Sequence, residues 1–545
     1  MPSSQYTASI AAALFLSFVV WLVSFSLKWR RHRAKYRHLP CPPHDFWWGH
    51  LKIIGMAKRE MPPGFHYHAL MYYIGEKYKM PPVFYLDLWP ISNPLMLVHD
   101  PDVAHQITQA RSLPKHPVNS KVLGPLVGSH SVVTAEGQEW KMLRSILNPG
   151  FSAQYLSTLV SLLVRHGLVF KDRISDYAST GEVFPIQDTA MALTIDVIGE
   201  VVLGKNFDSQ RQPNELTMHF KKAVSWAGPS MDVISWNLSR PFKWWHCVQQ
   251  DRIIEKMIRE RHAETRATDS HSTKAAVDLF LQAYREEKMG ASGKGGRRTD
   301  ELDPEFLNLA RDNVKTLLLG GHDTTSSTMA YTLALLSEPE NTHELARIRA
   351  EHDAVFGPDP TEAASMLLSD PRLLNSLPLT TAAVKESMRL FPAASTTRTT
   401  MPNHPVQTVS FRDQQLPLAG QQIWVAHYGF GQRGDLWPQP RKFIIDRFMP
   451  MSGETSPPPP PKDAWRPFEK GPRGCLGLEL AMTELRLILV LLCREFDFEI
   501  AYAEDAPRAP REHGVQGGRG YQIIEFAAKP VGHMPVRVRR REKIV

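Results

Sequence analysis

Hydrophobic positions recur with a helical period along most of the chain, and only short stretches alternate as strands do. The helical period predicts helices over 137–148, 156–177, 189–203, 303–336, 380–390 and 478–492. Strand-like patterns cover 83–89 and 94–98, predicted as one hairpin, and 496–501 and 521–526, predicted as another. Residues 115–135 and the proline run 457–461 are predicted loops, as is the Gly/Lys/Arg-rich stretch 286–301. The pattern therefore predicts a mainly α protein with small β-sheets.

The longest apolar run lies near the N-terminus, at residues 10–27, and no charged side chain precedes Lys28. Such a run can cross the ~30 Å hydrocarbon core of a bilayer as one helix. A cleaved signal peptide is the alternative, but it would carry basic residues before a shorter apolar run. Here the lysines and arginines follow the run. We therefore expect a retained single-pass anchor at 7–27, with the remaining chain on the cytoplasmic side.

Length and charge change this picture little. The 545 residues suggest three or four domains, and the net charge of +8 is concentrated at 28–37 and 537–541. No nucleic-acid-binding motif accompanies these basic runs, which favours a membrane surface or an acidic protein partner and no nucleic acid. Residues 28–44 form a basic, proline-rich hinge between the anchor and a globular body over 45–545.

The four cysteines exclude several chemistries. They are Cys41, Cys247, Cys475 and Cys493, and no two form the CxxC or CxxCH spacing of a zinc site or a covalently attached haem. Cys475 stands in a loop with three glycines and a proline, just before a predicted helix. Free amides and the helix dipole there would favour a thiolate, and hence an axial iron ligand. A buried structural cysteine is the alternative from local chemistry alone.

Two glycines, Gly320 and Gly321, interrupt the predicted helix 303–336. Each costs roughly 1 kcal/mol against alanine, so close approach of a flat ligand or of another helix is needed to explain them. Thr324 can bond back to the Gly320 carbonyl, and Asp323 beside it can relay protons. His322 is expected to point away from any iron.

Three further groups carry chemistry. Trp140 and Arg144 share a helical face, which suits an anion, although a surface cation–π pair is the alternative. Glu386 and Arg389 are three residues apart and could form a buried network with Arg447. Tryptophans and basic residues over 226–245 suit either a membrane interface or the core.

Together these residues resemble a known family. The cysteine loop fits F-x-x-G-x-R-x-C-x-G, and it is preceded in order by W-x-x-x-R, G-G-x-D-T-T, E-x-x-R and F-x-x-x-R-F. The chain is similar to membrane-anchored cytochromes P-450, most of all to fungal members of secondary metabolism. The resemblance implies one large P-450-fold domain, which overrides the estimate from length.

The resemblance also implies roles for single residues. Cys475 would be the axial ligand of haem b (iron protoporphyrin IX), and Asp323 and Thr324 would deliver protons to oxygen. Glu386, Arg389 and Arg447 would form a structural network. The haem would be bound by Trp140, Arg144, Gly320, Gly321, Arg398, Phe468, Gly471, Arg473 and Gly477.

The implied activity is oxidation of a lipophilic small molecule, such as a terpenoid or polyketide. The oxidant would be O₂, with electrons from NADPH through cytochrome P-450 reductase, and cytochrome b5 is a further partner. The implied location is the endoplasmic reticulum membrane. Lys470 and Arg466 beside the cysteine loop would face the reductase. An oxygen-independent haem-thiolate isomerase or dehydratase and a non-catalytic haem-binding membrane protein are the alternatives.

Overall fold

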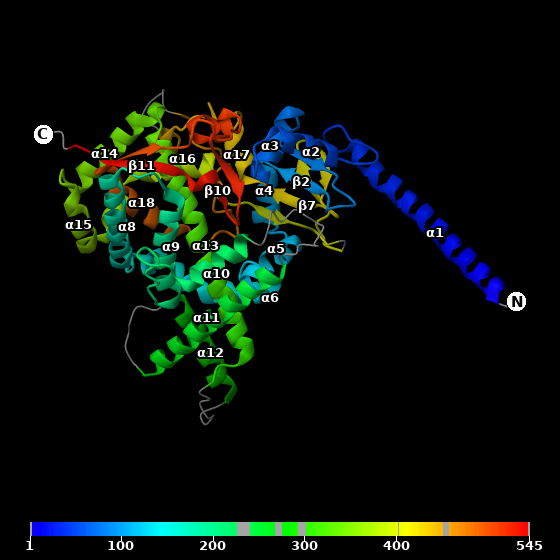
Figure 1. Ribbon diagram of the computed structural model, residues 1–545, viewed down its shortest axis with the longest axis horizontal. Helices are drawn as coiled ribbons and strands as arrows, with labels where there is room; N and C mark the ends of the chain where they lie inside the picture. The colour runs from blue at the N-terminus through cyan, green and yellow to red at the C-terminus, as the bar shows by residue number, and fades with distance from the viewer. Residues whose placement is uncertain are drawn as a thin grey trace.

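A computed structural model of the chain describes residues 3–225, 240–267, 275–292, 301–401, 403–450 and 457–542. Within these ranges a large helical body adjoins a smaller region of β-strands, and helix α1 projects from that smaller region (Figure 1). The mainly α architecture with small sheets confirms the prediction from the hydrophobic pattern.

The described helices begin and end as follows. The first half of the chain holds α1 (Ser3–Ala34), α2 (Leu51–Glu60), α3 (Tyr67–Lys77), α4 (Pro101–His105), α5 (Val118–Val127), α6 (Gly137–Leu147), α7 (Ala153–Ser157), α8 (Val160–Thr180), α9 (Ile186–Leu203), α10 (Glu215–Ser225) and α11 (Arg240–Ala267). The second half holds α12 (Ala276–Ser292), α13 (Pro304–Ser337), α14 (Thr342–Phe356), α15 (Ala363–Ser369), α16 (Pro378–Leu390), α17 (His427–Gln432), α18 (Leu478–Cys493) and α19 (Val515–Gly518).

The strands form four small sheets within the described residues. The predicted hairpin is β1 (Val83–Leu86) with β2 (Leu95–Val98), and β2 also pairs in parallel with β7 (Gln422–Val425), which pairs with β4 (Thr396–Arg398). A second hairpin joins β9 (Gly520–Ile524) to β10 (Ala528–Pro530). The remaining sheets are β3 (Phe184–Pro185) with β11 (Pro535–Arg540) and β8 (Phe496–Ile500), and β5 (Thr408–Phe411) with β6 (Gln414–Pro417).

The predicted pairing of 496–501 with 521–526 is wrong. Strand β8 pairs instead with β11, the basic segment near the C-terminus, and β9 turns back on β10. Val536 and Val538 of β11 are buried, whereas Arg537 and Arg539 oppose Glu499 and Asp497 in the register. The strand pattern of β11 is hard to recognise in the sequence, because only two apolar residues, Val536 and Val538, alternate with its arginines.

Helix α13 is the centre of the body. It is 34 residues long, and almost every side chain after Val314 is buried. It packs against α9, α11 and α16, and the Tyr331 ring stacks on Phe391 after α16 (4.2 Å between centroids). A helix that is buried on all faces is enclosed by other elements, so α13 fixes the positions of the surrounding helices.

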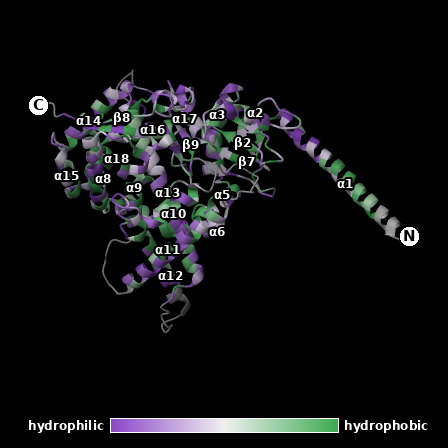
Figure 2. Ribbon diagram, in the orientation of Figure 1, coloured by the Kyte–Doolittle hydropathy of each residue, from purple (hydrophilic) through white to green (hydrophobic). Residues whose placement is uncertain are grey.

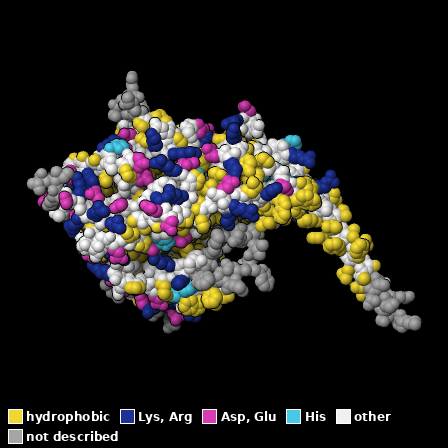
Figure 3. Space-filling model, turned by 45° about the horizontal axis from the view of Figure 1, so that its top comes forward, with side chains coloured by type: hydrophobic (Ala, Val, Ile, Leu, Met, Phe, Trp, Pro, Cys, Tyr) yellow, Lys and Arg dark blue, Asp and Glu magenta, His cyan; other side chains and the backbone are white. Residues whose placement is uncertain are grey.

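Helix α1 carries the predicted anchor. Among the described residues it is the one helix long and apolar enough to cross a membrane, and Figure 2 shows hydrophobic residues along its middle. The apolar side chains of this part are exposed. The helix does not end with the apolar run but continues through the basic residues to Ala34. Hydrophobic side chains also gather where α1 meets the body (Figure 3), including the exposed Phe46, Trp47 and Trp48.

The end of α1 is bound to the body through the buried carboxylate of Asp87. Arg33 donates to this carboxylate, and His32 and His44 each approach it to 2.9 Å. Burial alone would raise the pKa of Asp87, but the bonds from His32, His44 and Arg33 hold that pKa well below its usual range. The predicted spacer after α1 is therefore packed onto the body, and Pro42 is buried.

The structure differs from the sequence prediction in segments 115–135 and 286–301, and it describes only part of 226–245. The predicted loop 115–135 is wrong in part, because α5 occupies Val118–Val127 despite its internal Gly124 and Pro125. Of the tryptophan-rich stretch 226–245, residues 226–239 lie outside the described residues, and Trp244 and Trp245 are exposed on α11. Helix α12 extends to Ser292, so the predicted loop 286–301 begins later, and its residues 293–300 lie outside the described residues.

Buried histidines predict acid sensitivity. Burial lowers the pKa of His99 and His352 to about 3, and that of His50 and His513 to about 4. The unfolded chain binds these protons near pH 6.5, so stability is lost as pH falls below that value. By pH 5 each histidine should cost about 1–2 kcal/mol, measured by thermal unfolding in detergent.

The variant His99→Phe should flatten this pH dependence, because His99 packs among Tyr72, Phe84 and Phe430. His38→Phe is the control, since His38 is exposed. Equal slopes for the two variants between pH 7 and 5 would contradict the assignment.

Candidate cofactor site

The loop that ends at Cys475 has a backbone shaped by hydrogen bonds to itself. The Cys475 amide donates to the Phe468 carbonyl (2.8 Å), and the Gly474 amide donates to the Gly471 carbonyl (2.9 Å). Gly471 has φ +86°, and a Cβ there would lie 2.4 Å from the Thr108 carbonyl oxygen. Glycine is therefore required at 471 by both conformation and space.

Two opposing effects act on the pKa of the Cys475 thiol. Burial raises the pKa of the thiol, whereas the Gly477 amide and the Arg144 guanidinium lower it. Arg144 lies close because its Nη1 donates to the Gly474 carbonyl (2.9 Å). Although it lies deep in the protein, the Cys475 side chain is accessible, so it faces open space and not packed side chains. The alternative of a packed structural cysteine does not fit this geometry.

Four cations stand around this loop. Arg398 is buried on β4, and its Nε and Nη1 have no hydrogen-bond partner among the described residues. Burial lowers the pKa of Arg398 and, with the neighbouring guanidiniums, lowers that of Arg473 to about 10. Arg144 is the third cation. The unpartnered guanidinium of Arg398 calls for an anion, because an unpaired charge in the interior is costly.

Lys115 is the fourth cation, and the motifs missed it. It lies in a β-bridge with Arg398, and its Nζ donates to the Val133 carbonyl (2.9 Å). Burial, together with Arg398 and Arg473, lowers the pKa of Lys115 to about 7. Little in the sequence could have pointed to Lys115, because it is a single lysine in a region without helical or strand periodicity.

The two aromatic residues of the motifs border these groups. The Arg473 guanidinium lies over the Trp140 ring at 4.1 Å and also donates to the Ala135 carbonyl (2.8 Å) and to Glu136. The Phe468 ring lies 6.0 Å from Trp465, whose indole donates to the Lys385 carbonyl (3.0 Å). Trp140 thus makes a cation–π contact with Arg473, and Arg144 bonds to Gly474, so all three residues adjoin the Cys475 loop.

The two glycines of α13 differ in their surroundings. A Cβ on Gly320 would meet nothing within 4 Å, so this position borders open space. A Cβ on Gly321 would lie 2.7 Å from the Ile198 side chain of α9. The interpretation that a glycine allows close approach of a flat ligand therefore fits Gly320. The interpretation that a glycine allows close helix packing fits Gly321. The expected bond from Thr324 Oγ1 to the Gly320 carbonyl is present at 2.8 Å.

The two residues before Thr324 point elsewhere. His322 is buried, its Nδ1 lies 2.7 Å from the Leu318 carbonyl of its own helix, and burial lowers its pKa. The Asp323 carboxylate is buried as well, and it accepts from the Ala527 amide (2.8 Å) and pairs with Lys529 (2.6 Å). Asp323 is thus held by the β9–β10 hairpin, an arrangement that motif spacing could not show.

A buried ion network supports the segment before the cysteine loop. Glu386 pairs with Arg389 (2.7 Å) and Arg447 (3.1 Å), and all three residues are buried. Arg389 and Arg447 also donate to backbone carbonyls at Gly431, Gln439, Pro440 and Lys442. The network thereby joins α16 to the irregular chain from 431 to 448.

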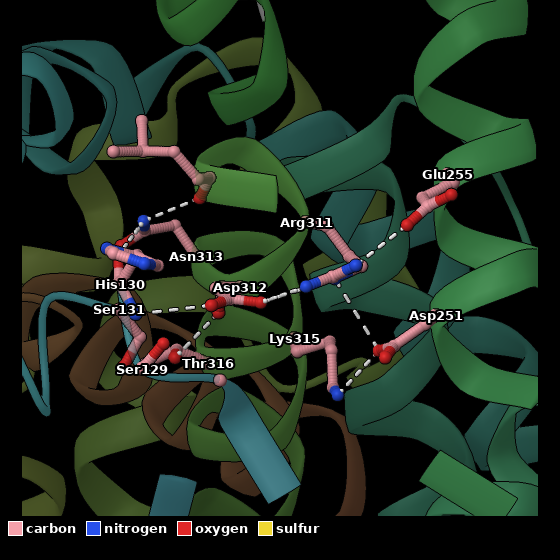
Figure 4. A network of polar contacts seen from close by, with 12 residues as sticks. Ser129, His130, Ser131, Asp251, Glu255, Arg311, Asp312, Asn313, Lys315 and Thr316 are labelled. Carbon is pink, nitrogen blue, oxygen red and sulfur yellow. Dashed lines mark hydrogen bonds and ion pairs between the residues drawn. The ribbon is translucent and has the colours of Figure 1, made fainter. Parts of the chain in front are cut away.

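Near its N-terminal end, α13 binds the loop that follows α5 (Figure 4). Asp312 accepts from the His130 amide (3.1 Å), and Asn313 accepts from the Val132 amide (2.9 Å). Gly128, with φ +86°, is required here because a Cβ would overlap the Asp312 carboxylate. The next turn reaches α11, where Lys315 pairs with Asp251 (2.7 Å).

The expected surface position of Arg466 is wrong. Its side chain is fully buried and donates to Glu469 and to Thr108 Oγ1 (2.5 Å). Burial would raise the pKa of Glu469, but His427 and Arg466 lower it to about 2. Arg466 is thus the internal counter-charge of Glu469. Lys470 is partly exposed and pairs with Asp463 (3.0 Å).

A model of the family "Cytochrome P450" matches residues 40–523. The chain belongs to the cytochrome P450 family. It is 33% identical to cytochrome P450 monooxygenase polC of Polytolypa hystricis, over 97% of this chain and 96% of that protein. It is 34% identical to cytochrome P450 monooxygenase acrF of Aspergillus aculeatus, over 89% of this chain and all of that one. These relatives identify it as a P450 monooxygenase.

The fold agrees with this assignment. The crystal structure of the cytochrome P450DA heme domain superposes with a TM-score of 0.69, covering 92% of this chain and 98% of that one at 20% identity. P450 membership implies a haem cofactor. The accessible Cys475, the open face at Gly320 and the unpartnered Arg398 guanidinium fit a flat, dianionic iron porphyrin.

The two glycines give a matched pair of variants. Gly321→Ala should destabilise the protein by about 1–3 kcal/mol, because the new methyl group overlaps Ile198. In the haem-free protein, Gly320→Ala should be neutral or stabilising by up to about 1 kcal/mol, since alanine favours the helix and meets no neighbouring protein atom. Thermal unfolding of the two proteins measures the difference.

Adding Ile198→Val to Gly321→Ala should restore part of the loss, because it removes the Ile198 Cδ1 methyl group, which would lie 2.9 Å from the new Cβ. Equal stability of the two alanine variants would show that the packing of α9 on α13 does not require Gly321.

Proposed function

We propose that this P450 oxidises a lipophilic small molecule of fungal secondary metabolism with O₂ and electrons derived from NADPH. The observation that carries the proposal is the Cys475 loop. Its thiol is accessible, and both the Gly477 amide and the Arg144 guanidinium favour the thiolate form. Bound haem would supply the oxidising iron, with Cys475 as its axial ligand. The fungal relatives at 33–34% identity support the metabolic setting.

The surrounding residues hold the cofactor. Arg398, Arg473 and Arg144 would pair with the haem propionates, with Lys115 as a fourth cation and Trp140 as a donor. Phe468 would pack beside the sulfur. Gly471, Gly477 and Gly320 would let the backbone lie close to the porphyrin, whereas Gly321 serves the helix contact with Ile198. Glu386, Arg389 and Arg447 would keep the loop in place.

Asp323 and Thr324 would supply protons. The Thr324 hydroxyl donates to the Gly320 carbonyl and so stands at the open face of α13. Asp323 adjoins it but faces the β9–β10 hairpin. The presence of Asp323 beside Thr324 argues against an oxygen-independent isomerase or dehydratase and against a non-catalytic haem protein. None of these has to deliver protons to oxygen.

The membrane setting follows from α1. Residues 7–27 would cross the endoplasmic reticulum membrane, 28–44 would connect, and 45–545 would form the catalytic domain on the cytoplasmic side. Anchoring brings the enzyme to lipophilic substrates and to a membrane-bound NADPH–cytochrome P450 reductase, with cytochrome b5 as a second donor. Lys470 is the basic residue of the loop that can meet an acidic partner.

The assignment of Cys475 has a direct spectroscopic test. Reduced, CO-treated protein should show the red-shifted Soret band of a haem thiolate, and Cys475→Ser should abolish it, because serine offers no soft ligand. Cys41→Ser is the control, since Cys41 lies in the segment after α1, where its thiol donates to the Tyr36 carbonyl. An unchanged band in Cys475→Ser would overturn the ligand assignment.

The role of Thr324 has a separate test. Thr324→Ala should keep the spectrum but divert NADPH-derived electrons to hydrogen peroxide, because the hydroxyl that supplies protons is gone. Thr328→Ala is the control, as Thr328 donates to the Thr324 carbonyl one turn further along α13. The measurement is peroxide formed per NADPH in membranes that contain reductase; full coupling in Thr324→Ala would refute the role. Mass spectrometry for a product with one added oxygen would identify the substrate.

A further inference from the structure

A run of alternating charges leads from Asp323 to the protein surface. Asp323 pairs with Lys529 on β10 (2.6 Å), and Lys529 contacts Glu525, which precedes β10 (3.4 Å). Glu525 contacts His533 (3.5 Å), and His533 Nδ1 lies 3.0 Å from Asp188 at the start of α9. Five side chains from three separate parts of the chain thus form one continuous path.

Exposure rises along this path. The side chains of Asp323 and Lys529 are 3% and 6% exposed, whereas those of Glu525, His533 and Asp188 are 36%, 29% and 34% exposed. Lys221 of α10, which contacts Asp188, is 55% exposed. The path therefore begins in the interior and ends in water, and its inner end lies next to Thr324.

The hairpin holds Lys529 in place. The Ala527 amide donates to the second oxygen of Asp323 (2.8 Å), and Ser327 of α13 donates to the Ala528 carbonyl (2.7 Å). Burial disfavours the charge of Lys529, but the carboxylates of Asp323 and Glu525 outweigh it and raise the pKa of Lys529. The lysine is therefore a fixed, protonated group that touches Asp323 directly.

We propose that Lys529 positions Asp323 and, with Glu525 and His533, conducts protons from water at the Asp188 surface to Asp323. The proposal rests on the proposed function, in which Asp323 and Thr324 supply protons for oxygen chemistry. It adds three residues that lie outside the family motifs. Their order is set by the contacts: His533 outermost, Glu525 next and Lys529 innermost.

The transfer balances as a relay of one proton. An N–H bond of the Lys529 ammonium breaks and an O–H bond forms on Asp323. The Glu525 carboxylate first takes a proton from imidazolium His533 and then passes it to the resulting amine, and the neutral His533 regains a proton from water. The first step is uphill because the ion pair favours the ammonium, so it proceeds only as the site consumes the proton. One proton leaves bulk water for each one that is used.

His533 is suited to the outer position. The hydrogen bonds that His533 donates to Asp188 of α9 and Glu525 of the hairpin outweigh burial and raise its pKa to about 9. The cations Lys221 and Lys529 stand behind these two carboxylates. The histidine is thus protonated at neutral pH and can donate inward while it faces water.

Turnover in water and in D₂O tests the inner part of the path. The probe is oxygen-dependent NADPH consumption in membranes with reductase. Lys529→Met should slow it by about ten-fold or more and enlarge the solvent isotope effect, because the innermost donor is lost. Lys529→Arg should recover most of the rate, since it keeps the charge. Glu525→Gln and His533→Gln, at partly exposed positions, should enlarge the isotope effect without unfolding the protein.

Lys171→Met is the matched control. Lys171 is a largely buried lysine that pairs with Glu495 and not with Asp323. It should lose stability without a change in the isotope effect. If Lys529→Met, Glu525→Gln and His533→Gln all match the wild type in rate and isotope effect, the relay is wrong. Loss of the haem-thiolate band in the wild type would instead overturn the proposed function.

Thermal unfolding tests the outer part without turnover. A histidine with a raised pKa stabilises the fold below the unfolded value near 6.5, and that stabilisation is lost as pH rises through 9. The wild type should therefore lose stability between pH 6.5 and 9, and His533→Gln should lose less. Identical curves would show that His533 is not paired with Asp188 and Glu525, and would overturn the outer part of the path.

Discussion

The cysteine loop depends on one buried carboxylate that lies far from it in sequence. Glu386 is fully buried and binds two arginines, which in turn bind four backbone carbonyls of the irregular chain 431–448. That chain has little regular structure of its own, so its carbonyls need such partners. A buried ion pair adds little net stability, but removal of one partner costs about 3–5 kcal/mol. The network therefore acts chiefly by excluding other conformations of the segment before Cys475.

The second constraint is the charge around the cofactor site. Lys115, Arg144, Arg398 and Arg473 surround the loop, and Glu136 and Glu469 are the acids that act on them. Glu469 is already neutralised by His427 and Arg466. The site thus has an excess of positive charge that a dianionic porphyrin would balance. Cofactor binding should contribute directly to folding stability, because the ligand binds only the native state.

Motif chemistry and helical periodicity predicted much of this structure, because both depend on residues close together in sequence. The helical period found α6, α9, α13, α16 and α18, and the glycine pattern located the Cys475 loop. What sequence could not show depends on distant partners. The α5 helix forms despite Gly124 and Pro125, with the loop after it held by Asp312 and Asn313 of α13. Likewise, β8 selects β11 over β9 because two buried valines fit its face.

Single charges in loops were the hardest to place, since an arginine on a turn has no periodicity to indicate its direction. Arg466 and Lys470 are four residues apart, yet one is buried against Glu469 and Thr108 and the other is partly exposed. The difference arises from Thr108, which lies more than three hundred residues earlier. Lys115 is the reverse case, an ordinary loop lysine that long-range contacts place beside Arg398.

The contact between Asp323 and the β9–β10 hairpin makes two structural features interdependent. The Asp323 carboxylate uses one oxygen for the Ala527 amide and the other for Lys529, so its direction and the position of the hairpin cannot change separately. The Ala527 amide is kept in most substitutions at 527, whereas the ion pair needs a cationic side chain at 529. A change at Phe526, which is 36% exposed at the tip, leaves both bonds possible. A change at Lys529 to an uncharged residue removes the cation that pairs with this buried carboxylate, so among the described residues Asp323 is left with the Ala527 amide alone. The hairpin can therefore vary at its tip only while position 529 keeps a cationic side chain.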